Sequence, residues 1–95
     1  MNIGKAIKEL RKEKGLSQSD LAQVTGITQA AISGIENGKR PGVATLKKIC
    51  DALQISESLV YIMALEKEDV PAEKAILYES LFPIIQKFVL QVAGK

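Results

Sequence analysis

The sequence predicts an all-α fold in which five short helices form one domain and a longer amphipathic helix follows. Apolar residues recur at intervals of three and four, as they do on one face of a packed helix. Glycines and small hydroxyl residues stand where these periodic segments begin and end. Alternation of apolar and polar residues, the mark of a strand, is not sustained anywhere. We therefore expect a helical domain over residues 1–66 and a C-terminal helical segment over 67–95.

The first helix is predicted over residues 3–14. Ile3, Ile7 and Leu10 recur on one face, with basic residues between them. Gly15 follows the last lysine and can adopt the left-handed conformation that ends many helices.

Two shorter helices joined by a tight turn are predicted next. Ser17 can cap a helix over about 18–24, and Gly26 can take the positive φ that a sharp turn requires. Thr28 can cap the following helix over about 29–36. The residues expected to face inward are Leu21, Ala22, Ile27, Ile32 and Ile35. The outward face of the later helix carries Thr28, Gln29, Ala30, Ser33 and Gly34.

A fourth and a fifth helix complete the predicted domain. Residues 43–53 repeat apolar groups at helical spacing, and Ser56 can cap a fifth helix that runs towards residue 66. In the fourth helix, the residues expected to face the core are Val43, Leu46, Ile49, Cys50 and Leu53. In the fifth helix, they are Leu59, Ile62 and Met63. The single cysteine cannot form an internal disulfide, which suits a reducing cytoplasm.

The C-terminal helix, expected over residues 72–93, has an apolar face wider than a five-helix domain needs. Pro83 falls on its polar side, where it would kink the helix or start a separate short one. We expect a dimerisation surface made of Leu77, Leu81, Ile84, Ile85, Phe88 and Val92. Two alternatives stay open: the face packs on its own domain, or the helix lies on a membrane surface, although its polar face is poor in Lys and Arg. No charge-free apolar run is long enough to span a membrane.

Charge is divided unevenly between the two halves of the chain. Residues 1–50 hold nine Lys or Arg against four acids, whereas residues 51–95 hold four Lys against seven acids. The basic half indicates either contact with a polyanion or an ordinary solvated surface. An enzyme, a metal site and a cofactor are not expected, because the chain has no histidine, no Gly-rich phosphate loop and no acidic cluster with metal-ligand spacing.

Residues 3–65 resemble the helix-turn-helix domain of the Cro/phage-repressor (XRE) family of DNA-binding regulators. The matching features are Gln18, Ala22, Gly26 and Ile32 at the family's spacings and the ending IENGKRP. The resemblance implies a five-helix repressor-like domain whose helix over about 28–36 lies in the major groove of double-stranded DNA. It also implies a homodimer on a near-palindromic operator, in the cytoplasm and associated with the nucleoid.

The resemblance implies a role for each matching residue. The bases would be read by Thr28, Gln29, Ala30 and Ser33. Among these, the amide of Gln29 can pair with N6 and N7 of adenine. The phosphates would be held by Lys8, Ser17, Gln18, Asn37, Lys39 and Arg40. Gln18 would also brace the third helix, and Arg11 and Glu36 would form a structural ion pair.

The third helix departs from many relatives at Ala30, Ala31 and Gly34, where longer polar side chains are common. Alanine can contact a thymine methyl group but donates no hydrogen bond, and glycine reads no base. Direct readout by each half-site should therefore be modest, with a second half-site or DNA shape supplying the rest, unless these small residues pack against something other than DNA. The alternative function is an antitoxin-like or other interaction module whose C-terminal helix binds a partner protein.

Overall fold

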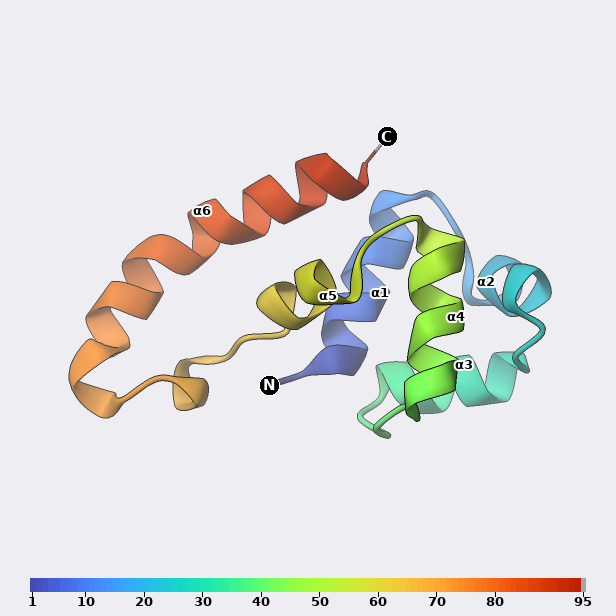
Figure 1. The fold of residues 1–95 in the computed structure, drawn as a ribbon, viewed down its shortest axis with the longest axis horizontal. Helices are drawn as coiled ribbons and strands as arrows, with labels where there is room; N and C mark the ends of the chain where they lie inside the picture. Colours follow the sequence, from blue (N-terminus) through green and yellow to red (C-terminus); the bar gives the residue numbers. More distant parts are fainter. Residues whose placement is uncertain (95) are drawn as a thin grey trace.

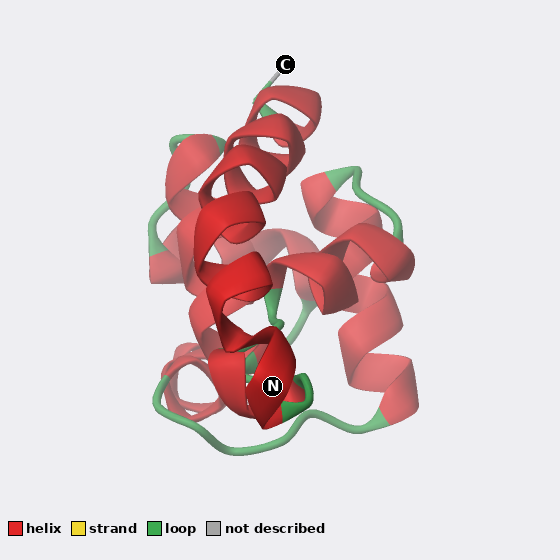
Figure 2. Cartoon of the chain, turned by 90° about the vertical axis from the view of Figure 1, so that its left-hand side faces the viewer, coloured by secondary structure: helices red, strands yellow, loops and turns green. Residues whose placement is uncertain are grey.

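The computed structural model describes residues 1–94, and each of these lies in a helix or a connecting loop (Figures 1 and 2). The α-helices are α1 (Ile3–Glu13), α2 (Gln18–Thr25), α3 (Gln29–Glu36), α4 (Val43–Leu53), α5 (Glu57–Met63) and α6 (Ala75–Ala93). Two short 3-10 turns, η1 (Lys67–Asp69) and η2 (Ala72–Lys74), separate α5 from α6. The predicted all-α fold is confirmed. Residue 95, the end of the expected C-terminal segment, lies outside the described residues.

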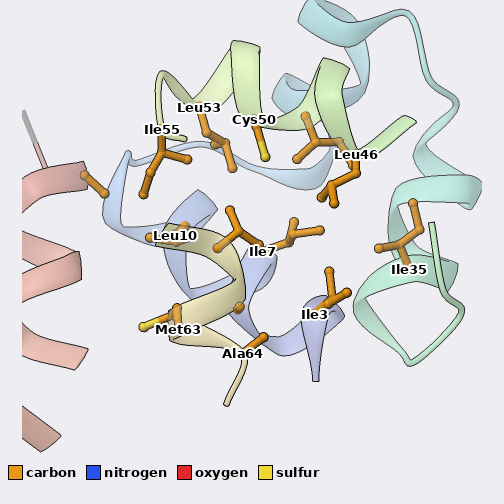
Figure 3. Packing of buried hydrophobic residues seen from close by; sticks show 14 of the residues in the cluster. Ile3, Ile7, Leu10, Ile35, Leu46, Cys50, Leu53, Ile55, Met63 and Ala64 are labelled. Carbon is orange, nitrogen blue, oxygen red and sulfur yellow. The ribbon is translucent and has the colours of Figure 1, made fainter. Parts of the chain in front are cut away.

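Helix α1 lies at the centre of the fold, where it packs against α3, α5 and α6 (Figure 1). Its residues Ile7 and Leu10 are fully buried, and Leu21 of α2 and Ile32 of α3 lie in the same core. Figure 3 shows Ile7 and Leu10 among the side chains of this core, with Cys50 of α4 buried as predicted. Burial of these apolar side chains holds α2 and α3 in a fixed orientation on α1.

Gly4 permits the close contact between the first turn of α1 and the end of α3. A Cβ atom at this position would overlap the carbonyl oxygen of Ile35 and lie 3.2 Å from Cα of Glu36. Both neighbours are backbone atoms, so no side-chain rotation could relieve the overlap. The sequence gives no hint of this contact, because glycine early in a helix usually indicates a cap.

The first turns of α2 and α3 have the caps that the sequence predicts. Oγ of Ser17 accepts the N–H of Asp20 at 2.9 Å, and Oδ2 of Asp20 accepts the N–H of Ser17 at 2.9 Å. Oγ1 of Thr28 accepts the N–H of Ala31 at 3.1 Å at the start of α3. Between the two helices, Gly26 adopts a φ of 75°, which only glycine takes without strain.

Two residues expected in the core are exposed instead. Val43 leaves 85% of its surface accessible, because it is the first residue of α4 and lies ahead of the turns that pack on the core. Ile62 leaves 38% accessible, because α5 turns Val60 and Met63 inward.

Helix α6 is continuous, with Pro83 inside it. The predicted alternative of a separate helix beginning at Pro83 is therefore wrong. Pro83 is exposed. Inside the helix it removes one backbone hydrogen bond, and its ring crowds the carbonyl group of Glu79. The helix curves along its length (Figure 1), as expected for a proline on the solvent side.

The second half of α6 packs on the five-helix body. Val89 and Ala93 are buried in the common core, and Ile85 and Leu90 pack partly against it. The expectation that the apolar face docks on its own domain is therefore correct for this side of the helix. The division of the chain near residue 66 stays a prediction, since the core is shared.

Two polar contacts also tether α6. Nε2 of Gln86 donates to Oε2 of Glu9 at 3.1 Å, and the hydroxyl of Tyr78 donates to the carbonyl oxygen of Leu65 at 3.0 Å. The helix therefore runs along one side of the five-helix body, as the two views in Figures 1 and 2 show.

By length and composition alone, the segment Ala72–Ala93 is apolar enough to cross a membrane. Helices of proteins outside membranes meet the same criterion. In this helix Val89 and Ala93 face the protein's own core, and Glu79 forms an ion pair with Lys67 at 3.1 Å. These contacts fit a helix docked on its domain, and the absence of a membrane span stays a prediction.

Candidate nucleic-acid interface

Helix α3 turns one face to the core and the other to solvent. Ile32 and Ile35 are buried on the inner face. On the outer side Gln29 and Ala30 are exposed and Ser33 is half-buried. Three of the predicted base-reading residues therefore lie along one accessible side of α3. The short side chains of Ala30 and Ser33 leave the backbone of this helix close to the surface.

The fourth predicted base-reading residue, Thr28, has a second task. Its Oγ1 accepts the N–H of Ala31 and so caps α3. The hydroxyl hydrogen can still be donated. Thr28 would therefore contact DNA with a side chain whose orientation the cap already fixes.

The predicted ion pair between α1 and α3 is present and is buried. Nε of Arg11 lies 2.7 Å from Oε2 of Glu36, and Nη2 of Arg11 lies 2.9 Å from Oε1. Nη1 of Arg11 also donates to the carbonyl oxygen of Leu16 at 2.7 Å. Only 8% of the Arg11 side chain and 2% of the Glu36 side chain are accessible. The two-point contact with Glu36 joins α1 to the end of α3. The bond to Leu16 joins α1 to the loop before α2.

Electrostatics keep this pair charged. Burial disfavours the carboxylate of Glu36, but hydrogen bonds from Arg11 and Gln18 outweigh burial and lower its pKa. The charge of Lys8 contributes in the same direction. The hydrogen bonds to Glu36 raise the pKa of Arg11. Lys8 itself is exposed on α1, one turn after Gly4, which lies against the end of α3.

Gln18 braces α3, as the family resemblance implies. Its Nε2 donates to Oε1 of Glu36 at 3.0 Å. One amide hydrogen of Gln18 therefore points inward, and the amide retains a second hydrogen for another acceptor. Ser17, at the start of the same helix, accepts the N–H of Asp20 and retains its hydroxyl hydrogen. Both residues can thus donate to an anionic oxygen at the N-terminus of α2.

A basic loop follows α3. Asn37 ends the helix, Gly38 adopts a φ of 118°, and the N–H of Lys39 donates to the carbonyl oxygen of Gly34 at 2.9 Å. Lys39 and Arg40 are exposed. The loop therefore places two cations beside the end of the outer face of α3.

The start of α4 is a further candidate for phosphate contact that the sequence analysis missed. Within residues 1–94, no side chain caps the first turn of α4, which begins after Gly42. Its N–H groups stand next to the basic loop, and a hollow of about 180 Å³ lies between them and α3. Helix N-termini favour anionic oxygens. The signal in the sequence was Gly42, at a position where α2, α3 and α5 have a Ser or Thr cap.

A second accessible surface lies on α6. Five of the six residues predicted for dimerisation are exposed, and we call them the α6 apolar surface: Leu77, Leu81, Ile84, Phe88 and Val92. The sixth, Ile85, is half-buried and packs towards the core. An apolar groove of about 180 Å³ runs beside this surface, between α6 and the segment that includes Leu65 and Val70.

The described residues contain no group of histidine, cysteine and acidic side chains that could hold a metal ion. Burial raises the pKa of the Cys50 thiol to about 11, so this cysteine is protonated near neutral pH.

A helix-turn-helix family model matches residues 7–60, which is more than half of the chain. The chain belongs to the helix-turn-helix family of XRE-type DNA-binding regulators. Curated proteins that share this domain are named as transcriptional regulators or repressors.

Curated relatives agree with this family. The chain is 44% identical over 63 residues to the transcriptional repressor RghR of Bacillus subtilis, covering 63% of this chain and 47% of RghR. It is 37% identical over 98 residues to the regulator RghRB of the same organism, covering 96% of this chain and 69% of RghRB. It is 35% identical over 101 residues to the regulator SutR of Escherichia coli, covering 97% of this chain and 57% of SutR. No solved structure gives a significant match.

The chain spans about half the length of RghR, the repressor among these relatives. The match to RghR covers 63% of this chain, whereas the match to RghRB extends over nearly the whole chain.

Proposed function

We propose that this regulator is a sequence-specific repressor that binds near-palindromic double-stranded DNA as a homodimer, in the cytoplasm and on the nucleoid. One observation carries the proposal: the accessible face of α3 is held on α1 by the buried pair of Arg11 and Glu36 and ends in the cations of Lys39 and Arg40. A rigid helix with short outward side chains and flanking cations fits the major groove.

Base reading rests on few side chains. Gln29 is exposed at the start of α3, and its amide can pair with N6 and N7 of adenine. Ala30 can contact a thymine methyl group, and Ser33 and Thr28 can each donate one hydrogen bond. A bidentate contact contributes about 1–3 kcal/mol of discrimination. We therefore propose that a second half-site and DNA shape supply the remaining specificity.

The residues proposed to contact phosphates come from three segments near α3. Lys39 and Arg40 follow α3, Ser17 and Gln18 begin α2, and the exposed Lys8 lies on α1. If each protomer neutralises about four phosphates, a plot of the logarithm of the binding constant against the logarithm of salt concentration should have a slope of about −7.

The α6 apolar surface is our proposed homodimer interface. Five large apolar side chains stay exposed along one side of α6 although Val89 and Ala93 already anchor the helix. A two-fold dimer would place two recognition helices about 34 Å apart, one turn of DNA.

The proposal is tested by titrating the protein with random-sequence duplexes and with duplexes selected from a random pool, at several salt concentrations. A steep salt slope, a palindromic selected site and a dimer mass in sedimentation are expected. Gln29→Ala should lose discrimination at one base pair of each half-site and keep the salt slope. Weak binding to every duplex without salt dependence would disprove the DNA-binding proposal.

The exposed α6 apolar surface favours a second candidate, a module that binds another protein. Under this candidate the protein sediments as a monomer, Gln29→Ala has no effect on DNA, and changes at Leu81 or Phe88 abolish binding to the partner. A dimer mass together with an effect of Gln29→Ala would reject it.

A further inference from the structure

Gly34 occupies an interior position of α3 at which the fold does not require glycine. Its φ is not positive, in contrast to those of Gly26 and Gly38. A Cβ atom at position 34 would meet only Cδ of Lys39, at the ordinary contact distance of 4.0 Å. Gly4, by comparison, has no room for a Cβ atom. Glycine inside a helix is less stable than alanine, so folding alone would favour alanine at position 34.

The outer surface of α3 gives a reason for this glycine. Ala30 and Gly34 lie four residues apart, on the side of the helix away from Ile32 and Ile35. At position 34 this side is bare backbone, with the side chain of Lys39 beside it. The strip of α3 that contains Ala30 and Gly34 therefore carries no side chain longer than the methyl group of Ala30.

We propose that Gly34 is a specificity-determining residue, whose missing side chain lets the base edges of the major groove approach the backbone of α3. This inference rests on the proposed DNA binding. A methyl group at position 34 would hold α3 away from those bases and weaken the contacts of Ala30 and Ser33. Because a dimer carries the change twice, its effect on affinity is doubled in free energy.

The test is Gly34→Ala, studied in the full chain with a duplex selected by the unaltered protein. The thermal midpoint should rise, the affinity for the selected duplex should fall at least tenfold, and the salt slope should stay the same because the phosphate contacts remain. A selection repeated with Gly34→Ala should yield a changed consensus at the bases nearest position 34.

Gln54→Gly is the matched control. Gln54 ends α4 with a φ of 56°, a conformation that glycine adopts without strain. The control should also raise the thermal midpoint, yet leave the affinity for DNA unchanged, because it lies at the end of α4 away from the basic loop.

Equal or tighter binding of the selected duplex by Gly34→Ala would overturn the inference while leaving the proposed function intact. If the unaltered protein shows no salt-dependent binding to any duplex, the proposed function and this inference both fail.

Discussion

Three side chains at the junction of α1, α2 and α3 determine how the recognition helix is held. Glu36 accepts hydrogen bonds from Arg11 and Gln18 while 2% of its side chain is accessible. A buried charge without its partner is strongly destabilising, whereas a fully hydrogen-bonded pair is tolerated. The carboxylate of Glu36 therefore joins the end of α3 to both α1 and α2.

Glu36→Gln should lower the free energy of unfolding by about 3–5 kcal/mol at neutral pH, because it leaves Arg11 buried without a counter-charge. The pKa of Glu36 is lowered from its usual value of 4.5, so its contribution is complete above that value and is lost as pH falls through the folded-state pKa. Urea unfolding at several pH values measures this.

The difference between Glu36→Gln and the unaltered protein should therefore shrink in acid. Asp51→Asn is the control, since Asp51 pairs with Lys47 at 3.6 Å on the surface with about two thirds of each side chain accessible. Exposed pairs contribute little. A difference for Glu36→Gln that is independent of pH would contradict this prediction.

Gly4→Ala should lower the free energy of unfolding by about 3 kcal/mol, because the new Cβ overlaps the backbone of Ile35 and forces α1 away from α3. Chemical denaturation measures the change. Gly42→Ala is the matched control, since a Cβ atom there meets no atom within 4 Å and its φ is −69°. Equal losses in the two variants would show that the close contact of Gly4 is not needed.

Among the helices, α6 has a buried side and an exposed side that are both apolar. Packing against the neighbouring helices, rather than residue type, decides which side is buried. Phe88 and Val89 are adjacent and both apolar, yet Phe88 leaves 58% of its surface accessible and Val89 leaves none. Val89 is the buried anchor that fixes the second half of α6 to the core. The first half extends beyond the body and carries most of the α6 apolar surface.

Val89→Ala should lower the free energy of unfolding by about 2 kcal/mol, because it removes buried methyl groups and leaves a cavity. Phe88→Ala, measured in dilute protein, should change it by less than about 0.5 kcal/mol. Thermal and urea unfolding of the two variants give the comparison. A larger loss for Phe88→Ala would mean that α6 packs with its other side inward.

At the scale of the whole molecule, two surfaces have separate roles in our proposal. The face of α3 and the basic loop would meet DNA, and the α6 apolar surface would join two copies. A contiguous exposed apolar surface is common at sites of protein association. The two-fold relation would then set the spacing of the recognition helices.

Phe88→Glu should convert the proposed dimer to a monomer in sedimentation, because it places a charge in an apolar interface. Binding to a duplex with two half-sites should weaken at least about a hundredfold, or about 2.7 kcal/mol, while binding to one half-site should stay unchanged. Lys87→Gln, next to it on the polar side, is the control. A dimer mass for Phe88→Glu would exclude the α6 apolar surface as the interface.

Local sequence patterns predicted the helices and the caps of α2, α3 and α5. These features depend on neighbours a few residues apart: Ser17 caps α2, Thr28 caps α3 and Gly26 turns the chain between them. The family's spacings also predicted the pair of Arg11 and Glu36, which the structure contains.

Contacts between distant segments show which side of α6 is buried and why position 4 is glycine. They also show that Glu36 accepts one amide hydrogen of Gln18. The tertiary structure also shows Val43 and Ile62 exposed and the uncapped start of α4 beside the basic loop. The physical reason is that periodicity fixes the direction of a side chain relative to its own helix. What lies opposite that side chain is set by residues distant in the chain.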